Sequence, residues 1–350
     1  MTLRFAFLAV VLAVSAVGAT PGSGTSGRSP VDELTLEQQV GQLLVLRFKG
    51  TVVPEYVLEA LRRRRVAGVI LFRDNIAGPA QLRALTRSLR ATGGAPLVAV
   101  DQEGGDIRIL RWAPPFASQP AQAAAGTVRR DAEAGARALR SLGITISLAP
   151  VADVPSGSRT ALATRAFSGD PKRAGRAVIA AVNGWRAGGV APTVKHFPGL
   201  GDAGRNTDGA RVTINLTRAE LETDHLPPFA AAVRAGVPIV MVGHARYPAL
   251  DRAHIASQSR AIVEDLLRVE LGFGGVVMTD SMEAKASLAT GGIRAVSERA
   301  VRAGADVVLL TGRGSYEPVF RQLLAVGRGS EAFRARVRES AARVLALKRT

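Results

Sequence analysis

Short apolar runs alternate with amphipathic stretches along the chain after its first thirty residues. The runs are four to six residues long and are mostly continuously apolar, which is typical of parallel strands covered on both faces. In chain order they are Leu43–Phe48, Gly68–Phe72, Pro96–Val100, Ile144–Ala149, Ala191–Val194, Pro238–Gly243, Gly275–Thr279 and Ala305–Leu310. The pattern therefore predicts eight buried strands.

The stretches between these runs carry apolar residues at helical spacing. We expect helices over Ala80–Ala91, Pro171–Ala187, Arg218–Ala235, Arg260–Leu271 and Arg294–Ala303, and a closing helix over Glu331–Lys348. Three of them end in a glycine just before the next strand, at Gly236, Gly272 and Gly304. Glycine readily adopts the left-handed conformation that ends a helix.

Strands and helices in strict alternation define the predicted fold class. Eight β/α units in about 320 residues predict an α/β protein with one domain, a (β/α)8 TIM barrel. A doubly wound open sheet is the alternative. We find no internal repeat and no second domain after Arg328, so we expect residues 31–350 to form the barrel domain.

The first thirty residues have a different character. Arg4 precedes an apolar run over residues 5–19 that ends in small residues, which is typical of a secretory signal. The run is short for a stable transmembrane span, which needs about 20 residues. We therefore predict a signal peptide over residues 1–19, a flexible Gly/Ser-rich linker over residues 20–30, and an exported or envelope-associated protein. A buried N-terminal helix is the alternative.

Composition excludes several classes of protein. The chain has no cysteine, which excludes disulfide scaffolds, thiolate metal sites, a cysteine nucleophile and a lipid-attachment cysteine. Its net charge of +17 comes mainly from arginine and favours an arginine-rich solvated surface, with weak association with an anionic cell wall as the alternative. Aromatic residues are only 5% and no nucleic-acid-binding module is recognisable, so we predict no nucleic-acid partner.

Polar residues follow five of the eight predicted strands. They are Asp101–Gly105, Asp153, Lys195–Gly199, His244 and Thr279–Ser281. In a β/α barrel the carboxyl ends of the strands meet at one face and build the active site. Carboxylates, a lysine and two histidines around one pocket suit a polyhydroxylated ligand. No phosphate loop, cofactor fingerprint or metal-ligand cluster accompanies them, so we predict neither cofactor nor metal.

Five segments together resemble a known family. They read VDQEGG at residues 100–105, RAFSGDP at 165–171, KHFPGLGD at 195–202, HARYPALD at 244–251 and LGFGGVVMTDS at 271–281. In this order and spacing, over about residues 35–310, the chain resembles glycoside hydrolase family 3 in its single-domain β-N-acetylglucosaminidase branch. The resemblance implies a carbohydrate substrate with a β-linked amino sugar.

The resemblance also implies roles for individual residues. Asp280 occupies the position of the nucleophile of a retaining glycosidase, although an aspartate there also suits a helix N-cap. The family residues that hydrogen-bond the sugar next to the scissile bond correspond to Asp101, Arg165, Lys195 and His196. His244 is a further candidate for the pocket wall, and Glu103 is expected to brace its loop.

The sequence departs from the branch at the acid/base. The branch places an Asp-x-His unit on the loop after the fifth strand, and these positions read Asn206-Thr207-Asp208 here. Asp208 is therefore the candidate acid/base on the Gly-rich loop over residues 199–211, with Asp202 as second choice. The alternative is a site that binds sugar with slow or no turnover.

A second departure lies near Asp101. The branch carries an arginine eight positions after this aspartate, where Ile109 stands here, and Arg108 or Arg111 is the candidate replacement.

These observations lead to one predicted function and two alternatives. We predict an exported retaining β-glycosidase that hydrolyses terminal β-N-acetylhexosaminides such as N-acetylglucosamine, from cell-wall or peptidoglycan fragments, through a covalent intermediate on Asp280. Substrate-assisted hydrolysis by the acetamido group is the competing mechanism. The alternative functions are a β-glucosidase-like exo-hydrolase of neutral sugars and a non-catalytic sugar- or wall-binding protein.

Overall fold

The structure is a computed structural model that describes residues 29–349. The predicted signal peptide, and the predicted linker up to residue 28, lie outside the described residues. Within residues 29–349, no helix is both long enough and apolar enough to span a membrane.

Eight parallel strands close into a barrel in the order β1-β10-β9-β8-β7-β6-β3-β2. The strands are β1 (Leu44–Arg47), β2 (Gly68–Ile70), β3 (Leu97–Val100), β6 (Ile146–Ser147), β7 (Ala191–Phe197), β8 (Ile239–Val242), β9 (Val276–Ser281) and β10 (Val307–Leu310). First and last strands pair in register, with Leu44 opposite Val308. The predicted TIM barrel and its eight strands are confirmed, and the open sheet is wrong.

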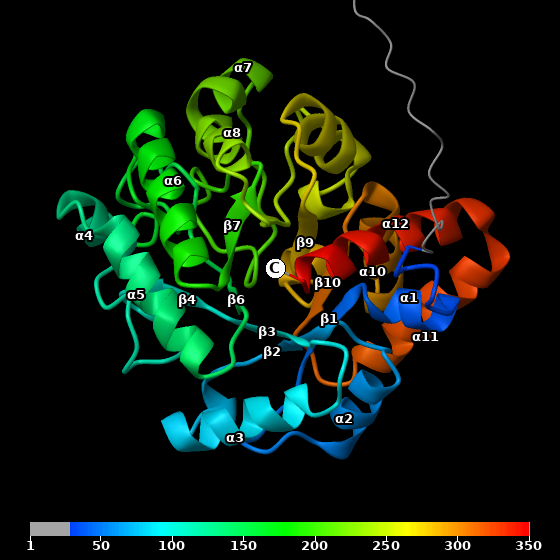
Figure 1. Cartoon of the computed structure of the whole chain (residues 1–350). Helices are drawn as coiled ribbons and strands as arrows, with labels where there is room; N and C mark the ends of the chain where they lie inside the picture. The colour runs from blue at the N-terminus through cyan, green and yellow to red at the C-terminus, as the bar shows by residue number, and fades with distance from the viewer. Residues whose placement is uncertain (1–28, 350) are drawn as a thin grey trace, which may run out of the picture.

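Helices surround the strands on all sides (Figure 1). The α-helices are α1 (Leu36–Gly41), α2 (Glu55–Arg62), α3 (Pro79–Arg90), α4 (Gln119–Ala124), α5 (Val128–Ser141), α6 (Pro171–Ala187), α7 (Arg218–Glu220), α8 (Leu226–Arg234), α9 (Lys285–Leu288), α10 (Ile293–Ala303), α11 (Tyr316–Gly329) and α12 (Glu331–Leu347). Short 3₁₀ turns η1 (Arg73–Asn75) and η3 (Ala256–Gln258) and the π-helical segments η2 (Leu221–His225) and η4 (Ala261–Glu270) complete the set.

Two of the predicted helices differ in form. The helix predicted over residues 218–235 is divided into α7, η2 and α8, because Pro227 and Pro228 lack an N–H and so restart the hydrogen-bond ladder. The helix predicted over residues 260–271 is π-helical. The glycines predicted to end helices, Gly236, Gly272 and Gly304, all have positive φ.

Apolar side chains fill two layers. One layer lies inside the barrel and includes Val45, Ile70 and Met278, while a larger layer packs the outer face of the strands against the helices. Successive residues of a strand point to opposite faces, so both faces of these strands must be apolar. This explains the continuous apolar runs of the sequence. The end of α12 (red) reaches the centre of the ring in Figure 1, and its Val344 joins the inner layer.

A small β-hairpin directly after Asp101 interrupts the alternation of barrel strands and helices. Its antiparallel strands are β4 (Gln102–Gly104) and β5 (Ile107–Arg108). The buried side chain of Gln102 donates to the carbonyls of Leu110 and Ala113, and so fixes the loop that follows. The hairpin places Glu103 beneath the carboxyl end of the barrel.

Candidate active site

A cavity of about 410 Å³ opens at the carboxyl ends of the strands. Six of the seven predicted site residues line it: Asp101, Arg165, Lys195, His196, Asp208 and Asp280. They come from segments that are far apart in the sequence and that meet only because the barrel closes. The seventh, His244, is buried beside the cavity and does not line it.

Asp280 lies near the carboxyl end of β9 and accepts a hydrogen bond from the backbone N–H of Ser281 at 2.7 Å. Burial favours its neutral form, but the positive potential of His196, His244 and Lys195 and this N–H outweigh burial and lower the pKa of Asp280 below its usual value. The helix that follows, α9, begins after Ala284, so Asp280 does not cap it. The carboxylate is therefore available to the cavity in its ionised form.

His244 acts on this region through its neighbours. Its Nδ1 lies 2.8 Å from Ser257 Oγ, and its Nε2 lies 2.8 Å from the carbonyl oxygen of Ser281. The ring therefore fixes the backbone next to Asp280. It lies outside the cavity lining, and its role in substrate binding remains a prediction.

A chain of buried charges joins the third, fourth and fifth strand ends. Lys195 Nζ lies 2.7 Å from Asp101 Oδ1 and 2.7 Å from Glu103 Oε1. Arg165 holds Glu103 with two hydrogen bonds, of 3.0 and 2.6 Å. Although burial opposes ionisation, the two cations lower the pKa of Glu103 to about 2. Glu103 thus fixes Arg165 and Lys195 from below, as expected of a residue that braces the site.

Asp153 holds the turn that carries His196. Its buried carboxylate lies 2.7 Å from His196 Nδ1 and accepts the backbone N–H groups of His196 at 3.2 Å and of Leu200 at 2.6 Å. With Nδ1 engaged by Asp153, the Nε2 edge of the ring is left for other partners. Asp153 therefore orients His196.

The loop that carries Asp208 is hydrogen-bonded to the segment after Asp280. The carbonyl of Asp208 accepts the N–H of Lys285 at 3.0 Å, and the carbonyl of Thr207 accepts the N–H of Ala286 at 3.1 Å. Burial, and after it the negative charge of Asp280, raise the pKa of Asp208. The two carboxylates therefore share the cavity, and their pKa values are shifted in opposite directions.

Asn206 and Asp202, which lie on the same loop as Asp208, have other partners. Asn206 Oδ1 accepts the backbone N–H of Asp208 at 3.0 Å, which orders the tip of the loop. Asp202 does not line the cavity and lies 3.4 Å from His225 Nε2. Of the two acid candidates, the geometry therefore favours Asp208.

Neither proposed replacement for the arginine of the branch lines the cavity. The Arg108 guanidinium donates to the carbonyls of Gly105 and Arg111, and Ile109 is bonded through its N–H to the carbonyl of Asp101. Arg111 is exposed and absent from the cavity lining. Within the described residues, one arginine besides Arg165 lines the cavity, and it comes from another barrel strand.

That arginine is Arg47, which the sequence analysis missed. It ends β1, lies over the Phe72 ring at 4.5 Å and pairs with Asp74 at 3.0 Å. Glu283 and Thr311 also line the cavity, and Glu283 Oε2 accepts the N–H of Thr311 at 2.8 Å. Their positions in the sequence were the signal that could have identified them, because Arg47, Glu283 and Thr311 each end or follow a predicted strand.

Known proteins are similar to this chain in sequence and in fold. Residues 35–347 match the family described as "Glycosyl hydrolase family 3 N terminal domain". A β-hexosaminidase of Stenotrophomonas maltophilia (strain K279a) is 36% identical over 280 residues, which are 77% of this chain and 83% of the relative.

Two solved structures extend the comparison. A β-N-acetylhexosaminidase from Beutenbergia cavernae DSM 12333 superposes with a TM-score of 0.84 at 33% identity, over 91% of this chain and 99% of that one. A glycoside hydrolase family 3 β-N-acetylglucosaminidase from Paenibacillus sp. str. FPU-7 has a TM-score of 0.86 at 35% identity. The match covers 90% of this chain and 62% of the Paenibacillus chain.

The barrel, the cavity ringed by carboxylates and these relatives define an enzyme of the glycoside hydrolase class. The chain belongs to glycoside hydrolase family 3, as the five sequence segments predicted.

Proposed function

We propose that the protein is an exported retaining β-N-acetylhexosaminidase that releases terminal N-acetylglucosamine from cell-wall fragments. The observation that carries the mechanism is the pair of carboxylates in one cavity, Asp280 with a lowered pKa and Asp208 with a raised pKa. Opposed protonation states are what a retaining glycosidase requires. The names of the relatives, β-hexosaminidase and β-N-acetylglucosaminidase, support the amino sugar as substrate.

In the first step Asp280 attacks the anomeric carbon of the sugar. The bond from this carbon to the leaving oxygen breaks, and its electron pair is protonated by Asp208. The products are the free alcohol, a glycosyl ester on Asp280 and an ionised Asp208.

In the second step water attacks the same carbon from the face that the leaving group vacated. Asp208 takes a proton from this water, and the ester bond to Asp280 breaks with return of its electrons to the carboxylate. Two inversions give net retention, and both carboxyl groups regain their starting states.

The charged chain beneath the cavity orients the sugar. Lys195 holds Asp101 so that the carboxylate can accept hydrogen bonds from sugar hydroxyls. Arg165 supplies a donor, and His196 presents the Nε2 edge of its ring, from neighbouring strand ends. Rigid, pre-paired groups of this kind need little reorganisation when the substrate binds.

The acetamido group separates this proposal from its rivals. If it were the nucleophile, Asp280 would carry no covalent sugar; if the enzyme were specific for neutral sugars, glycosides without the group would be better substrates. The family's Asp-x-His unit reads Asn206-Thr207-Asp208 in this chain. The experiment must therefore also distinguish an active enzyme from a site that binds sugar with slow or no turnover.

The test is trapping with a 5-fluoro glycosyl fluoride of N-acetylglucosamine, followed by peptide mass mapping. We expect inactivation with one sugar attached to the peptide that contains Asp280, and no attachment in Asp280→Asn. Paired aryl β-glycosides with and without the acetamido group then give the substrate class. A label on another residue, or turnover without any trapped species in either protein, would refute the covalent mechanism.

A further inference from the structure

Three arginines form a row at the amino end of the barrel, opposite the active site. Arg90, Arg140 and Arg186 lie in the last turns of α3, α5 and α6. Each lies close to the glycine turn that ends the next helix around the barrel. A Cβ added to the glycine would meet the arginine Nη1 at 3.0 Å for Gly143 and Arg90, 1.8 Å for Gly189 and Arg140, and 3.3 Å for Gly236 and Arg186.

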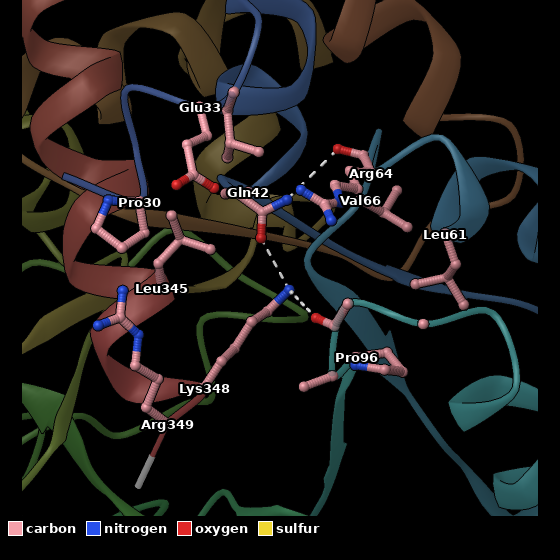
Figure 2. Close-up of a pocket in the computed structure, with 14 residues that line it drawn as sticks. Pro30, Glu33, Gln42, Leu61, Arg64, Val66, Pro96, Leu345, Lys348 and Arg349 are labelled. Atoms are coloured by element: carbon pink, nitrogen blue, oxygen red, sulfur yellow. Dashed lines mark hydrogen bonds between the residues drawn. The ribbon is translucent and has the colours of Figure 1, made fainter. Parts of the chain in front are cut away.

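These arginines border a hollow of about 640 Å³ at the amino ends of β3, β6, β7 and β8. Lys348, just after α12, also lines it, so residues 29–349 contribute four cations and no acidic or aromatic side chain to the lining of the hollow. A smaller hollow of about 230 Å³ shares Lys348 and adds Arg64 and Arg349, with Glu33 as its acidic residue (Figure 2). The two hollows share Ala95, Pro96 and Lys348 in their linings, and we call them together the amino-end groove.

The positive charge of the groove is weakly neutralised. No carboxylate of residues 29–349 lines the larger hollow beside Arg90 and Arg140, and Arg186 donates to the carbonyl of Ala235 at 3.0 Å. Figure 2 shows Lys348 Nζ bonded to a neutral acceptor, Gln42 Oε1, at 2.8 Å. Burial, and after it the nearby charge of Arg64, lower the pKa of Lys348 to about 8, as expected where positive charge accumulates.

The chemistry of the lining narrows the partner. Guanidinium groups match the oxygens of a phosphate in a forked geometry. Cations spread over neighbouring helices suit a chain of phosphates better than a single ion. The lining has no aromatic side chain for stacking nucleic-acid bases, and the large exposed hydrophobic residues of the described chain lie elsewhere, which disfavours insertion into a membrane.

We propose that the amino-end groove binds a linear phosphodiester polymer of the cell envelope. The net charge left weak association with an anionic wall as an alternative without a location, and the groove would give that association a site. Because the groove and the catalytic cavity lie at opposite ends of the barrel, this binding does not depend on the proposed glycosidase mechanism. It would hold the enzyme at the wall with its active site directed away from the polymer.

Arginines in a last turn also stabilise a helix by interacting with its dipole. A role confined to helix ends predicts lower thermal stability in arginine variants and no loss of polymer binding. The proposal predicts that polymer binding falls.

The test measures binding of poly(glycerol phosphate) to the full chain over a series of salt concentrations. For Arg90→Gln/Arg140→Gln we expect weaker binding and a slope of log K against log salt smaller by about 2, close to one unit per lost phosphate contact. The control is Arg294→Gln/Arg334→Gln, which removes two exposed arginines outside the groove and should retain both affinity and slope. Aryl-glycoside hydrolysis by both variants should match the parent, which also reports correct folding.

Three results would overturn the proposal. The first is equal loss of binding in both variants. The second is unchanged binding in the groove variant together with lowered thermal stability. The third is tighter binding of polyglutamate or of anionic vesicles than of the phosphodiester polymer at equal charge. If the double glutamine variant is unstable, Arg90→Lys/Arg140→Lys keeps the charges and removes the guanidinium forks. It is expected to bind with intermediate affinity, and parent-like affinity would refute the role of the forks.

Discussion

At the scale of single residues, surroundings decide what two identical side chains can do. Asp280 and Asp208 are both aspartates in one cavity, yet the electrostatic effect of His196, His244 and Lys195 favours the ionised form of Asp280, whereas burial and the charge of Asp280 favour the protonated form of Asp208. The sequence could name both residues by their places in the family pattern. It could not give their pKa values, since these depend on neighbours brought in by other strands.

The first prediction concerns Asp208. Activity requires protonated Asp208, so it is lost as pH rises through the raised pKa of this group. It also requires ionised Asp280, so it is lost as pH falls through the lowered pKa of that group. In Asp208→Asn we expect kcat/KM on substrates with poor leaving groups to fall by about 10²–10⁴-fold and the alkaline fall to disappear. The measurement is kcat/KM against pH for both proteins. Asp202→Asn is the control and should keep the parent profile; an alkaline fall that persists in Asp208→Asn would place the acid elsewhere.

At the scale of elements, a buried aspartate connects two strand ends. Asp153 follows β6, and its carboxylate fixes the ring of His196 and the N–H of Leu200 at the end of β7. The sequence placed Asp153 and His196 at neighbouring strand ends but did not show that one orients the other. Similarly, the β4–β5 hairpin was missed, because strands of two or three residues leave no periodic signal.

The second prediction concerns Asp153→Asn. The amide can accept fewer hydrogen bonds than the carboxylate and carries no charge, so one buried donor loses its acceptor. We expect the free energy of unfolding to fall by about 1–3 kcal/mol and kcat/KM to fall with it, because His196 loses its orientation.

Urea unfolding and aryl-glycoside kinetics check this prediction. The control is Asp170→Asn at the exposed start of α6, where asparagine caps a helix about as well as aspartate and little change is expected. Equal stability of the two variants would show that Asp153 does not hold the turn.

At the scale of the whole molecule, the last helix closes the amino end of the barrel through one buried charge. Asp306, which is buried just before β10, pairs with Arg336 at 2.5 Å and Arg343 at 3.1 Å from α12, and with Arg268 at 2.6 Å from η4. The sequence predicted α12 as a closing helix. Its place across the barrel depends on this network and on Val344 in the inner core layer.

The third prediction is that Asp306→Ala lowers the free energy of unfolding by about 3–5 kcal/mol, because it removes the buried carboxylate that three arginines share. Urea unfolding of the full chain measures it. Arg321→Ala, which removes an exposed pair with Glu317 at 2.8 Å, serves as the control and should cost less than about 1 kcal/mol. A loss for Asp306→Ala as small as that of the control would mean that α12 is held by apolar packing alone.

The sequence by itself determined the eight strands, the barrel and the family, because apolar periodicity and short ordered motifs are local along the chain. It also named six residues that line one cavity. Only the tertiary structure decided that Arg47 from the first strand joins them, that His244 lies behind Asp280, and that arginines from three helices form one groove at the opposite end. These are relations between distant segments, whose distances and electrostatic surroundings depend on side-chain packing across the closed barrel and are not encoded in any local pattern.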